Sequence, residues 1–254
     1  MIIDGKAIAE NILTQLSETI KTMGVTPTLA VIQIGDNPAS LAYIRQKQKA
    51  AEKIGAKIIV SNTLSDVDRF NADPHIHGLI IQRPVPEPVG EYHVKREKDV
   101  DGFEKNSPFD VPVAHAIGEI LTHIQTDFSK KFVVIGRGET AGAPIAHYLN
   151  KQHCATSVVH SQTPNPEEII KQADVIISCV GKERVVTKDT IKPGAILISV
   201  GIWRNDARKL HGDYDESDIS DIASYYTPTP GGVGPVNVAC LMQNLVKACK
   251  INLL

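Results

Sequence analysis

Short apolar runs alternate with longer amphipathic stretches in the first half of the chain. Residues 28–34, 57–60 and 76–81 are the apolar runs, rich in the β-branched side chains that strands favour. Residues 4–23 and Pro38–Ile54 instead repeat apolar side chains every three or four positions, which is the period of an amphipathic helix. This alternation of strands and helices predicts an α/β domain.

The same alternation continues in the second half with a more regular spacing. Neighbouring parallel strands are expected to be connected by two segments, 165–172 and the shorter 187–191. The predicted strands are 132–135, Ala155–Val159, 174–180 and 195–200. The strand at 132–135 is an unbroken apolar run, which is typical of a strand buried on both faces of a parallel sheet. The next three apolar runs are spaced by helix-length segments, so we predict a Rossmann-type dinucleotide-binding domain.

Five further segments complete the prediction. Residues 115–124 are expected to form a helix that leads into the dinucleotide domain, and 222–225 a last short strand. The polar stretch 207–220 is expected to be a surface excursion. Segment 227–235 mixes proline with glycine and is expected to be irregular but rigid, and 236–249 closes the chain as a helix with one apolar side.

A glycine-rich turn follows the strand at 132–135. Gly136, Gly138 and Ala141 stand in the order G-x-G-x-x-A, and helical periodicity begins directly afterwards. In dinucleotide sites the first glycine makes the tight turn, the second lets the backbone approach a pyrophosphate, and the small third residue allows close packing of helix and strand. We therefore expect a dinucleotide at this turn.

The residues near the turn bear on which dinucleotide binds. NAD sites usually carry an acid at the end of the second strand, where it accepts from the ribose hydroxyls. Here that position holds His160 and Ser161, and Arg137 lies in the turn. These groups suit a 2′-phosphate, so we expect NADP, with NAD as the alternative if Arg137 is only a surface residue and Ser161 only a turn residue.

Composition and charge exclude several classes of function. The chain has 254 residues, 27 basic and 29 acidic side chains and a net charge of −2, with no basic stripe that would favour nucleic acid or an anionic membrane. There is no signal-peptide pattern and no apolar run of membrane-spanning length. Four separated cysteines are typical of a reduced, cytoplasmic protein, and the nine scattered histidines form no metal motif, so we expect no metal even though His75 and His77 could share a strand face.

One lysine stands on the apolar side of the helix predicted at Pro38–Ile54. Tyr43, Ile44 and Ile54 are helical neighbours of Lys47 and are all apolar or aromatic. Burial of an ammonium group lowers its pKa toward neutrality, the range that is useful for proton transfer. A lysine whose stem packs while its head reaches solvent is the alternative explanation for this pattern.

Two loops carry further candidate chemistry. Gln82 follows the strand at 76–81 directly, at the carboxyl edge where open α/β sheets place ligands. Asp99 and Asp101 precede Gly102, which is the pattern either of a turn with one ligand-facing acid or of an ordinary solvated turn.

Taken together, the motifs resemble those of the bifunctional methylenetetrahydrofolate dehydrogenase/methenyltetrahydrofolate cyclohydrolase family. They occur in the family's order over nearly the whole chain. The matching motifs are Asp4-Gly5-Lys6, Asn37-Pro38-Ala39-Ser40, Tyr43-x-x-x-Lys47, Gln82-x-Pro84-x-Pro86, Lys98-Asp99-Val100-Asp101-Gly102-Phe103, Val134-Ile135-Gly136-Arg137, His160-Ser161, Pro228-x-Pro230-Gly231-Gly232-Val233-Gly234-Pro235 and Leu241-Met242-x-Asn244.

The resemblance implies two domains and two reactions. Residues 1–115, with the last helix at 236–254, would form an α/β folate domain, and 116–235 the dinucleotide domain, with the active-site cleft between them. NADP⁺ would oxidise 5,10-methylenetetrahydrofolate to the 5,10-methenyl cation, and water would convert that cation to 10-formyltetrahydrofolate. A homodimer formed through the dinucleotide domain is implied as well.

The resemblance also implies roles for individual residues. Lys47 would be the catalytic acid/base, Gln82 would hold it, Tyr43 would orient the pterin and Asp101 would accept hydrogen bonds from the pterin's N–H groups. Pro230, Gly231 and Gly232 would wall the substrate site. The candidate cofactor-binding residues are Gly136, Arg137, Gly138, Thr140, Ala141, His160, Ser161, Val180, Gly181, Gly201 and Ile202.

The chain departs from the family pattern at several positions. Segments 106–117 and 66–74 look shortened, the second as if a helix were lost. Gly138 replaces a serine and Glu139 adds a negative charge beside Arg137, which keeps NAD as an alternative. The remaining departures are Arg83 for leucine, Glu104 for histidine and Asn237 for threonine. Other possible functions are a dehydrogenase with little cyclohydrolase activity and a non-catalytic nucleotide-binding relative.

Overall fold

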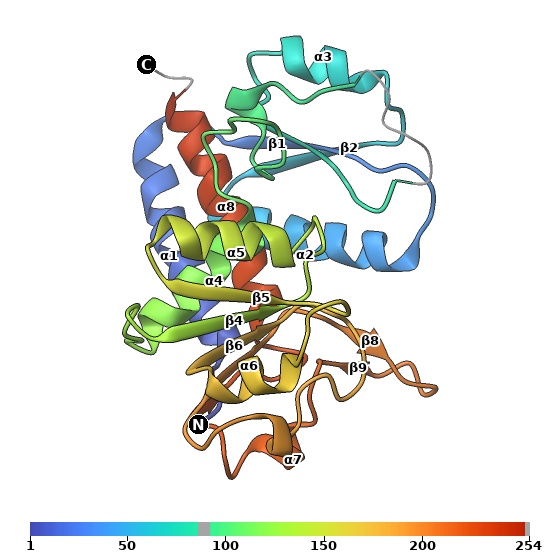
Figure 1. Cartoon of the computed structure of the whole chain (residues 1–254). Helices are drawn as coiled ribbons and strands as arrows, with labels where there is room; N and C mark the ends of the chain where they lie inside the picture. Colours follow the sequence, from blue (N-terminus) through green and yellow to red (C-terminus); the bar gives the residue numbers. More distant parts are fainter. Residues whose placement is uncertain (86–91, 252–254) are drawn as a thin grey trace. The chain divides into compact units, whose positions relative to one another are not determined.

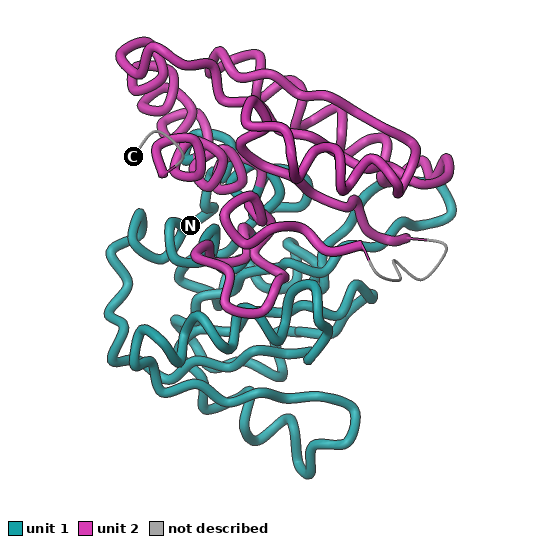
Figure 2. Tube along the Cα trace, turned by 90° about the horizontal axis from the view of Figure 1, so that it is seen from above, with its two compact units in different colours: residues 1–8, 113–237 teal, residues 9–112, 238–254 magenta. Residues whose placement is uncertain are grey.

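The computed structural model describes residues 1–85 and 92–251. Pro86 of the predicted loop and residues 252–254 of the predicted last helix lie outside the described residues. The chain forms two compact units, which Figure 2 shows in two colours. Unit 1 comprises Met1–Ile8 and Val113–Asn237, and unit 2 comprises Ala9–Pro112 and Val238–Leu254. Two long helices, α1 (Gly5–Met23) and α8 (Val233–Ile251), contribute residues to both units.

Unit 2 is built on a three-stranded parallel sheet in the order β2-β1-β3. The strands are β1 (Thr28–Ile32), β2 (Lys57–Ser61) and β3 (Gly78–Ile81). Every residue of the central strand β1 is buried, whereas the edge strand β2 exposes Ile59 and Val60. The sheet therefore matches the expected parallel α/β pattern, in which the middle strand is the most apolar.

Helices α2 (Pro38–Ile54) and α3 (Asp66–Ala72) connect these strands. The expectation that a helix is missing from 66–74 is wrong, because α3 lies there and buries Val67 and Phe70 against the sheet. Lys98, in the 3₁₀ turn η1 (Arg96–Lys98), stabilises the end of α3, since its Nζ donates to the backbone oxygens of Phe70 and Asp73 at 2.9 and 2.6 Å. Only seven residues of helix remain, too few for the apolar period to show in the sequence.

Unit 1 contains a five-stranded parallel sheet in the order β10-β7-β6-β4-β5. Its strands are β4 (Lys131–Ile135), β5 (Ala155–Val159), β6 (Val175–Ser178), β7 (Ile196–Ser199) and β10 (Tyr225–Tyr226). The chain reverses direction across the sheet between β4 and β6, which is the switch point where doubly wound sheets bind ligands. The predicted class, α/β with a Rossmann-type parallel sheet, is confirmed.

Helices cover both faces of this sheet. Figure 1 shows α5 (Gly142–Lys151) and α6 (Pro166–Gln172) on opposite sides of β4 and β5. Val133 and Ile135 pack on the side of α6 with Ile170. The remaining elements of unit 1 are α4 (Pro112–His123), the 3₁₀ turn η2 (Lys188–Thr190), the hairpin β8 (Trp203–Arg204) with β9 (Leu210–His211), and α7 (Glu216–Ile219).

Two predictions about the C-terminal part of unit 1 are wrong. Stretch 207–220 is not merely a surface excursion, because Asp213, Tyr214 and Ile219 are buried in the unit. Segment 227–235 is not irregular throughout, because α8 begins at Val233 rather than at Val236. A proline is tolerated in the first turn of a helix, where its missing N–H has no partner to lose, so Pro235 does not delay the helix.

Candidate active site

Helix α2 places one lysine on its buried face. Asn37 caps the helix by accepting hydrogen bonds from the backbone N–H groups of the second and third residues after it, and Pro38 occupies the first turn. Gly55 ends the helix in the left-handed conformation at φ 82°. Between these ends Lys47 is buried together with Ser40, Ile44, Ala50, Ala51 and Ile54.

The ammonium group of Lys47 has a partner inside unit 2. Lys47 is 9% exposed, and its Nζ donates a hydrogen bond to Oε1 of Gln82 at 2.7 Å. The other side of that amide, Nε2, donates to the backbone oxygen of Arg83 at 2.8 Å, which fixes the orientation of the amide. The alternative in which the lysine head reaches solvent is therefore wrong.

Asp101 lies within electrostatic reach of this pair. Burial lowers the pKa of Lys47, and the negative charge of Asp101 opposes that effect. Burial raises the pKa of Asp101, and the positive charges of Lys47 and Arg83 oppose it. The structure thus brings together the three polar residues predicted for proton transfer and pterin binding, and it leaves Lys47 an amine that gives up its proton more readily than a solvated lysine.

Asp99, two residues before Asp101, organises the loop that carries it. Its carboxylate accepts from the backbone N–H groups of Gly102 at 3.1 Å and Glu104 at 2.9 Å, and the side chain is buried. Burial raises the pKa of Asp99 to about 6. Of the two explanations for this acid pair, the solvated turn is wrong, because one acid is internal and holds the loop. The K-D-V-D-G spacing does not reveal which acid holds the loop.

Tyr43 and Arg83 lie near the same residues. Tyr43 is four residues before Lys47 on α2 and is 38% exposed, which is unusual for a large aromatic side chain. The Arg83 guanidinium lies over the ring of Phe103, 4.5 Å from its centroid, a cation–π distance. Arg83 therefore adds a positive charge where the family pattern has leucine.

The turn between β4 and α5 has the geometry expected of a dinucleotide loop. Gly136 has φ +104°, a conformation that favours glycine. A Cβ on Gly142 would lie 2.2 Å from the backbone oxygen of Gly136, whereas a Cβ on Gly138 would meet no atom within 4 Å. The close approach of helix and turn thus falls at Gly142 and not at Ala141, and the open backbone of Gly138 is free for a ligand.

Arg137 is held at the end of the second strand of unit 1. Its Nη2 donates to Oε1 of Gln162 at 3.1 Å, and the backbone N–H of Gln162 donates to Nδ1 of His160 at 3.2 Å. Ser161 between them is exposed, and Thr140 in the turn is exposed as well. Gln162 was missed by the sequence analysis, although its position one residue after His160-Ser161 makes it a natural partner for a turn arginine.

The loops after β6 and β7 approach each other closely. Gly181 has φ +73°, and a Cβ there would lie 3.1 Å from the backbone oxygen of Ile202. A Cβ on Gly201 would lie 2.3 Å from the backbone nitrogen of Gly181. Val180 and Ile202 are 38% and 40% exposed, so two apolar side chains face outward from these loops.

The predicted wall of the substrate site belongs to unit 1 and consists of Pro230, Gly231 and Gly232. The glycine turn belongs to unit 1 as well, whereas the Lys47 cluster belongs to unit 2. Gly231 has φ +113°, and a Cβ on Gly232 would lie 2.6 Å from Cβ of Thr227. This segment therefore favours glycine at two successive positions, because of the positive φ at Gly231 and the lack of space at Gly232. Its tight backbone agrees with the rigidity expected from its composition.

Among the described residues no group of three or more His, Cys, Asp or Glu side chains is arranged to hold a metal ion. His75 and His77 do not share a strand, because β3 begins at Gly78. His77 is buried and its Nδ1 accepts from the backbone N–H of Thr28 at 3.1 Å, while burial lowers its pKa. Within the same residues, each helix is too short or too polar to cross a bilayer.

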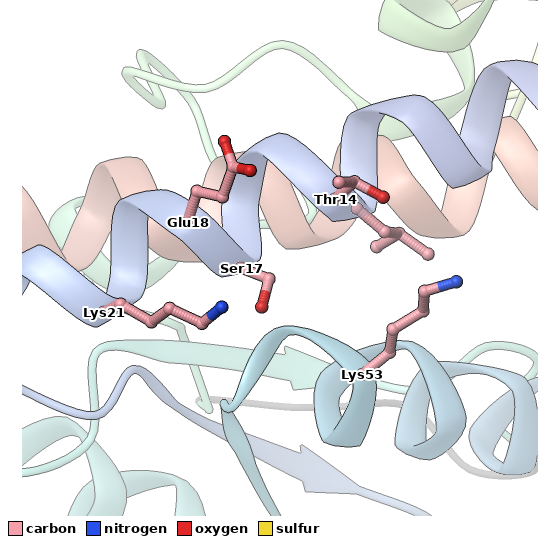
Figure 3. Close-up of a pocket in the computed structure, with 6 residues that line it drawn as sticks. Thr14, Ser17, Glu18, Lys21 and Lys53 are labelled. Atoms are coloured by element: carbon pink, nitrogen blue, oxygen red, sulfur yellow. The ribbon is translucent and has the colours of Figure 1, made fainter.

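A surface pocket of about 170 Å³ lies elsewhere in unit 2, between α1 and α2. Figure 3 shows the polar ends of Lys21 and Lys53 beside it, and Lys53 also forms an ion pair with Glu10. None of the predicted site residues lines it. The lining residues are Leu13, Thr14, Ser17, Glu18, Lys21 and Lys53.

Two family models of known enzymes match this chain. Residues 3–101 match the family model for the tetrahydrofolate dehydrogenase/cyclohydrolase catalytic domain, and residues 112–253 match that for the NAD(P)-binding domain of the same enzymes. The chain belongs to the tetrahydrofolate dehydrogenase/cyclohydrolase family. The Lys47 cluster falls in the catalytic match and the glycine turn in the NAD(P)-binding match.

Relatives of this family resemble the chain over its whole length. The bifunctional protein FolD of Bacillus subtilis (strain 168) is 38% identical over 275 residues, covering 98% of this chain and 97% of its own. The crystal structure of the FolD dehydrogenase/cyclohydrolase from Campylobacter jejuni matches with a TM-score of 0.91 at 33% identity, covering 99% of each chain. The Trypanosoma brucei FolD enzyme, complexed with NADP cofactor and inhibitor, matches with a TM-score of 0.92 at 30% identity, covering 100% of this chain and 98% of that one.

Proposed function

We propose that this protein oxidises 5,10-methylenetetrahydrofolate to the 5,10-methenyl derivative with NADP⁺ and hydrolyses that product to 10-formyltetrahydrofolate. The observation that supports this most strongly is the buried Lys47 ammonium bound to Gln82 at 2.7 Å within reach of Asp101. A degenerate relative would have no reason to keep a buried lysine, because burial of an ammonium is costly. The family of bifunctional enzymes to which the chain belongs supports both reactions.

The residues present fit a bound NADP⁺. The tight turn at Gly136, the close approach at Gly142 and the open backbone of Gly138 together form a cradle that larger side chains would fill. When bound, NADP⁺ supplies the hydride acceptor for the oxidation. The cofactor-binding set that we propose is Gly136, Arg137, Gly138, Thr140, Ala141, His160, Ser161, Val180, Gly181, Gly201 and Ile202.

Arg137 supports NADP over NAD. A guanidinium forms charge-assisted hydrogen bonds with phosphate oxygens, and here it is held at the end of β5 by Gln162. There is no acid at His160 or Ser161 to accept from a ribose hydroxyl. Arg137, His160 and Ser161 would therefore contact the 2′-phosphate. The choice of NADP is supported by the T. brucei relative, which is complexed with that cofactor.

In the hydrolysis step, the amine of Lys47 would move the protons. Water adds to the methenyl carbon, and a new C–O bond forms while neutral Lys47 takes a proton from that water. The C–N bond of the ring then breaks as the Lys47 ammonium returns its proton to the departing ring nitrogen. The added hydroxyl loses its own proton to solvent and becomes the formyl C=O, so one proton is released overall. A pKa lowered by burial lets one side chain perform both transfers.

The other site residues would bind and orient the substrate. The Asp101 carboxylate would accept hydrogen bonds from the pterin's N–H groups, and Tyr43 would stack on or orient the pterin. Pro230, Gly231 and Gly232 would form a wall beside the nicotinamide. Gln82 would keep Lys47 in position and help to set its protonation state.

At the level of domains, we propose residues 1–115 with the helix 236–254 as the folate domain and 116–235 as the dinucleotide domain. The compact units differ from this division mainly in grouping Met1–Ile8 with unit 1. We propose in addition a homodimer formed through the dinucleotide domain, in the cytoplasm, on the basis of the family resemblance and of the four free cysteines.

The substitution Lys47→Met tests this function. It keeps the length and apolar stem of the side chain and removes the amine, so methenyl hydrolysis should fall by about 10²–10⁴-fold, the usual contribution of a positioned acid/base group. NADPH binding should be unchanged. Lys49→Met, an exposed position on the same helix, is the matched control and should keep full activity. Hydrolysis at the wild-type rate in Lys47→Met would contradict the assignment.

A further inference from the structure

A buried carboxylate outside the predicted site lies beneath the loops assigned to the cofactor. Asp213 follows β9 in unit 1 and is 0% exposed. It stands in the stretch that the sequence analysis treated as a surface excursion. Buried carboxylates are rare unless they are hydrogen-bonded, so the partners of Asp213 indicate what it does.

The Asp213 carboxylate collects four hydrogen bonds from one short segment. Oδ2 accepts from Oγ of Ser178 at 2.6 Å and from the backbone N–H of Val180 at 2.9 Å. Oδ1 accepts from the backbone N–H groups of Gly181 at 2.7 Å and Lys182 at 3.0 Å. Successive backbone N–H groups that converge in this way form a nest for an anion, and here the anion is a side chain of the protein itself.

The loop after β7 packs closely against the same Asp213 carboxylate. A Cβ on Gly201 would lie 2.3 Å from Oδ2 and 2.5 Å from Oδ1 of Asp213. The backbone N–H of Asp213 donates to Oγ of Ser199 at 2.8 Å, and that hydroxyl donates to the backbone oxygen of Gly201 at 3.1 Å. One side chain therefore sets the path of both loops.

Asp213 is itself anchored to the sheet. The hydroxyl of its neighbour Tyr214 donates to the backbone oxygen of Thr227 at 2.7 Å, and the backbone N–H of Ser199 donates to Oγ1 of Thr227 at 2.9 Å. Trp203 binds the preceding residue, since its Nε1 donates to the backbone oxygen of Gly212 at 2.8 Å. These hydrogen bonds hold the Asp213 carboxylate in place, and the carboxylate in turn holds the two loops.

These loops lie at the switch point of the sheet. The backbone N–H of Cys179 donates to the backbone oxygen of Ile135 at 2.8 Å, and a Cβ on Gly136 would lie 3.1 Å from the backbone oxygen of Cys179. The segment held by Asp213 is therefore adjacent to the glycine turn. A dinucleotide bound at that turn must also meet the segment 180–182.

We infer that Asp213 is a positioning residue for the cofactor, which fixes the loops at Val180–Gly181 and Gly201–Ile202 in the conformation that binds NADP⁺. This inference rests on the proposed function. Asp213 takes no part in the proton transfers of the hydrolysis, because Lys47, Gln82 and Asp101 lie in unit 2.

The substitution Asp213→Asn tests the inference. The substitution keeps the size and shape of the side chain. The amide nitrogen of asparagine cannot accept from the N–H or O–H groups that it faces, so the loop at 180–182 loses some of its hydrogen bonds. We expect NADPH to bind at least tenfold more weakly, by fluorescence titration, and the KM for NADP⁺ to rise to match. Methenyl hydrolysis measured without cofactor should stay within twofold of wild type. Asp215→Asn makes the same chemical change two residues away, at an exposed position, and should alter neither quantity.

Hydrogen exchange in the cofactor-free protein gives a readout that is independent of binding. The amides of Val180, Gly181 and Lys182 should exchange at least tenfold faster in Asp213→Asn, and the amides of β1 should not change. If Asp213→Asn does not fold, Ser178→Ala removes one of the four hydrogen bonds and should weaken NADPH binding several-fold, again without loss of hydrolysis.

Two results would overturn the inference while leaving the proposed function intact. One is wild-type NADPH affinity together with wild-type exchange at 180–182 in a folded variant. The other is an equal loss of hydrolysis and NADPH binding, which would make Asp213 a residue of general stability. A wild-type protein that binds no NADPH would instead contradict the proposed function.

Discussion

Lys47 is held in the buried face of α2 by one strong acceptor, the amide oxygen of Gln82. Water would solvate the ammonium better than a single amide does, so the folded environment disfavours the charged form. The negative charge of Asp101 partly offsets this effect of burial, because an opposite charge nearby favours the ammonium form. The protonation state of Lys47 is thus balanced between burial and one carboxylate, which is the arrangement that a group needs if it both accepts and donates a proton.

This balance predicts the effect of Asp101→Asn on Lys47. Removal of the negative charge takes away the factor that raises the pKa of Lys47 and leaves burial, which lowers it, so the pKa should fall further. The change can be followed by NMR titration of the Lys47 side chain in the free enzyme. Because a neutral amine then persists to lower pH, the transition should move to lower pH than in wild type. An unchanged or higher pKa would contradict the electrostatic coupling.

Arg137 is the residue that separates the two dinucleotides. The loss of a hydrogen bond to a charged group costs about 1.5–3 kcal/mol, so Arg137→Ala should raise the KM for NADP⁺ by about tenfold or more. The KM for NAD⁺ should change little, because NAD⁺ has no 2′-phosphate. Steady-state kinetics with both cofactors measures the difference, and equal effects on both would mean that Arg137 is only structural.

At the scale of elements, the turn from β4 into α5 uses its glycines for different purposes. Gly142 is confined by the Gly136 backbone, and Gly138 is open. Gly142→Ala should therefore destabilise the folded state by about 1–3 kcal/mol, the usual cost of overpacking. In a chain of this size that lowers Tm by at least about 2 °C.

Gly138→Ala is the matched comparison in the same turn. It adds the same methyl group where no atom lies within 4 Å, so Tm should stay at the wild-type value. If the Gly138 backbone approaches the pyrophosphate, this variant should still bind NADPH more weakly. Thermal unfolding and NADPH titration of both variants separate packing from ligand contact, and equal Tm losses would refute the distinction.

The pattern of apolar residues along the sequence is enough to predict the helices and strands in which that pattern is long or unbroken. The bounds of α2 agree with the prediction, and so does the parallel pairing of the strands in unit 1. The pattern was insufficient for α3, which has only seven residues, and for the start of α8, where Pro235 and the glycines before it look like loop residues. In both cases tertiary packing stabilises a helix that local sequence only weakly favours.

The residues of the site also divide into those that the sequence pattern singles out and those that it does not. The pattern singles out Lys47, as one cation on an apolar stripe, and Gln82, as the residue that follows a strand. The roles proposed for both come from the family resemblance. Asp213 was not found, because it is one acid in a polar stretch and its four partners are more than thirty residues away in sequence. Asp99 and Asp101 cannot be told apart by spacing, since the folded conformation of the loop decides which acid accepts from its backbone N–H groups.

At the scale of the whole molecule, the two proposed chemistries belong to different compact units. Lys47, Gln82 and Asp101 lie in unit 2, and the glycine turn with the loops held by Asp213 lies in unit 1. Substitution of Lys47 should therefore affect hydrolysis far more than cofactor binding, and substitutions in the glycine turn should do the reverse. Substitution of Asp101, which we propose binds the pterin, should affect both reactions. A single kinetic experiment on the wild-type enzyme tests most directly whether this protein carries out both reactions.

That experiment is a time course of the wild-type enzyme with 5,10-methylenetetrahydrofolate, run with NADP⁺ and with NAD⁺. Reduced cofactor is followed by absorbance, and the folate product is measured before and after acid, which reconverts the 10-formyl product to the methenyl form. The account predicts reduced cofactor with NADP⁺ preferred, and acid-recoverable 10-formyltetrahydrofolate formed faster than by uncatalysed hydrolysis. Reduced cofactor with accumulating methenyl product would contradict the role of Lys47, and no turnover with either cofactor would contradict the proposed function as a whole.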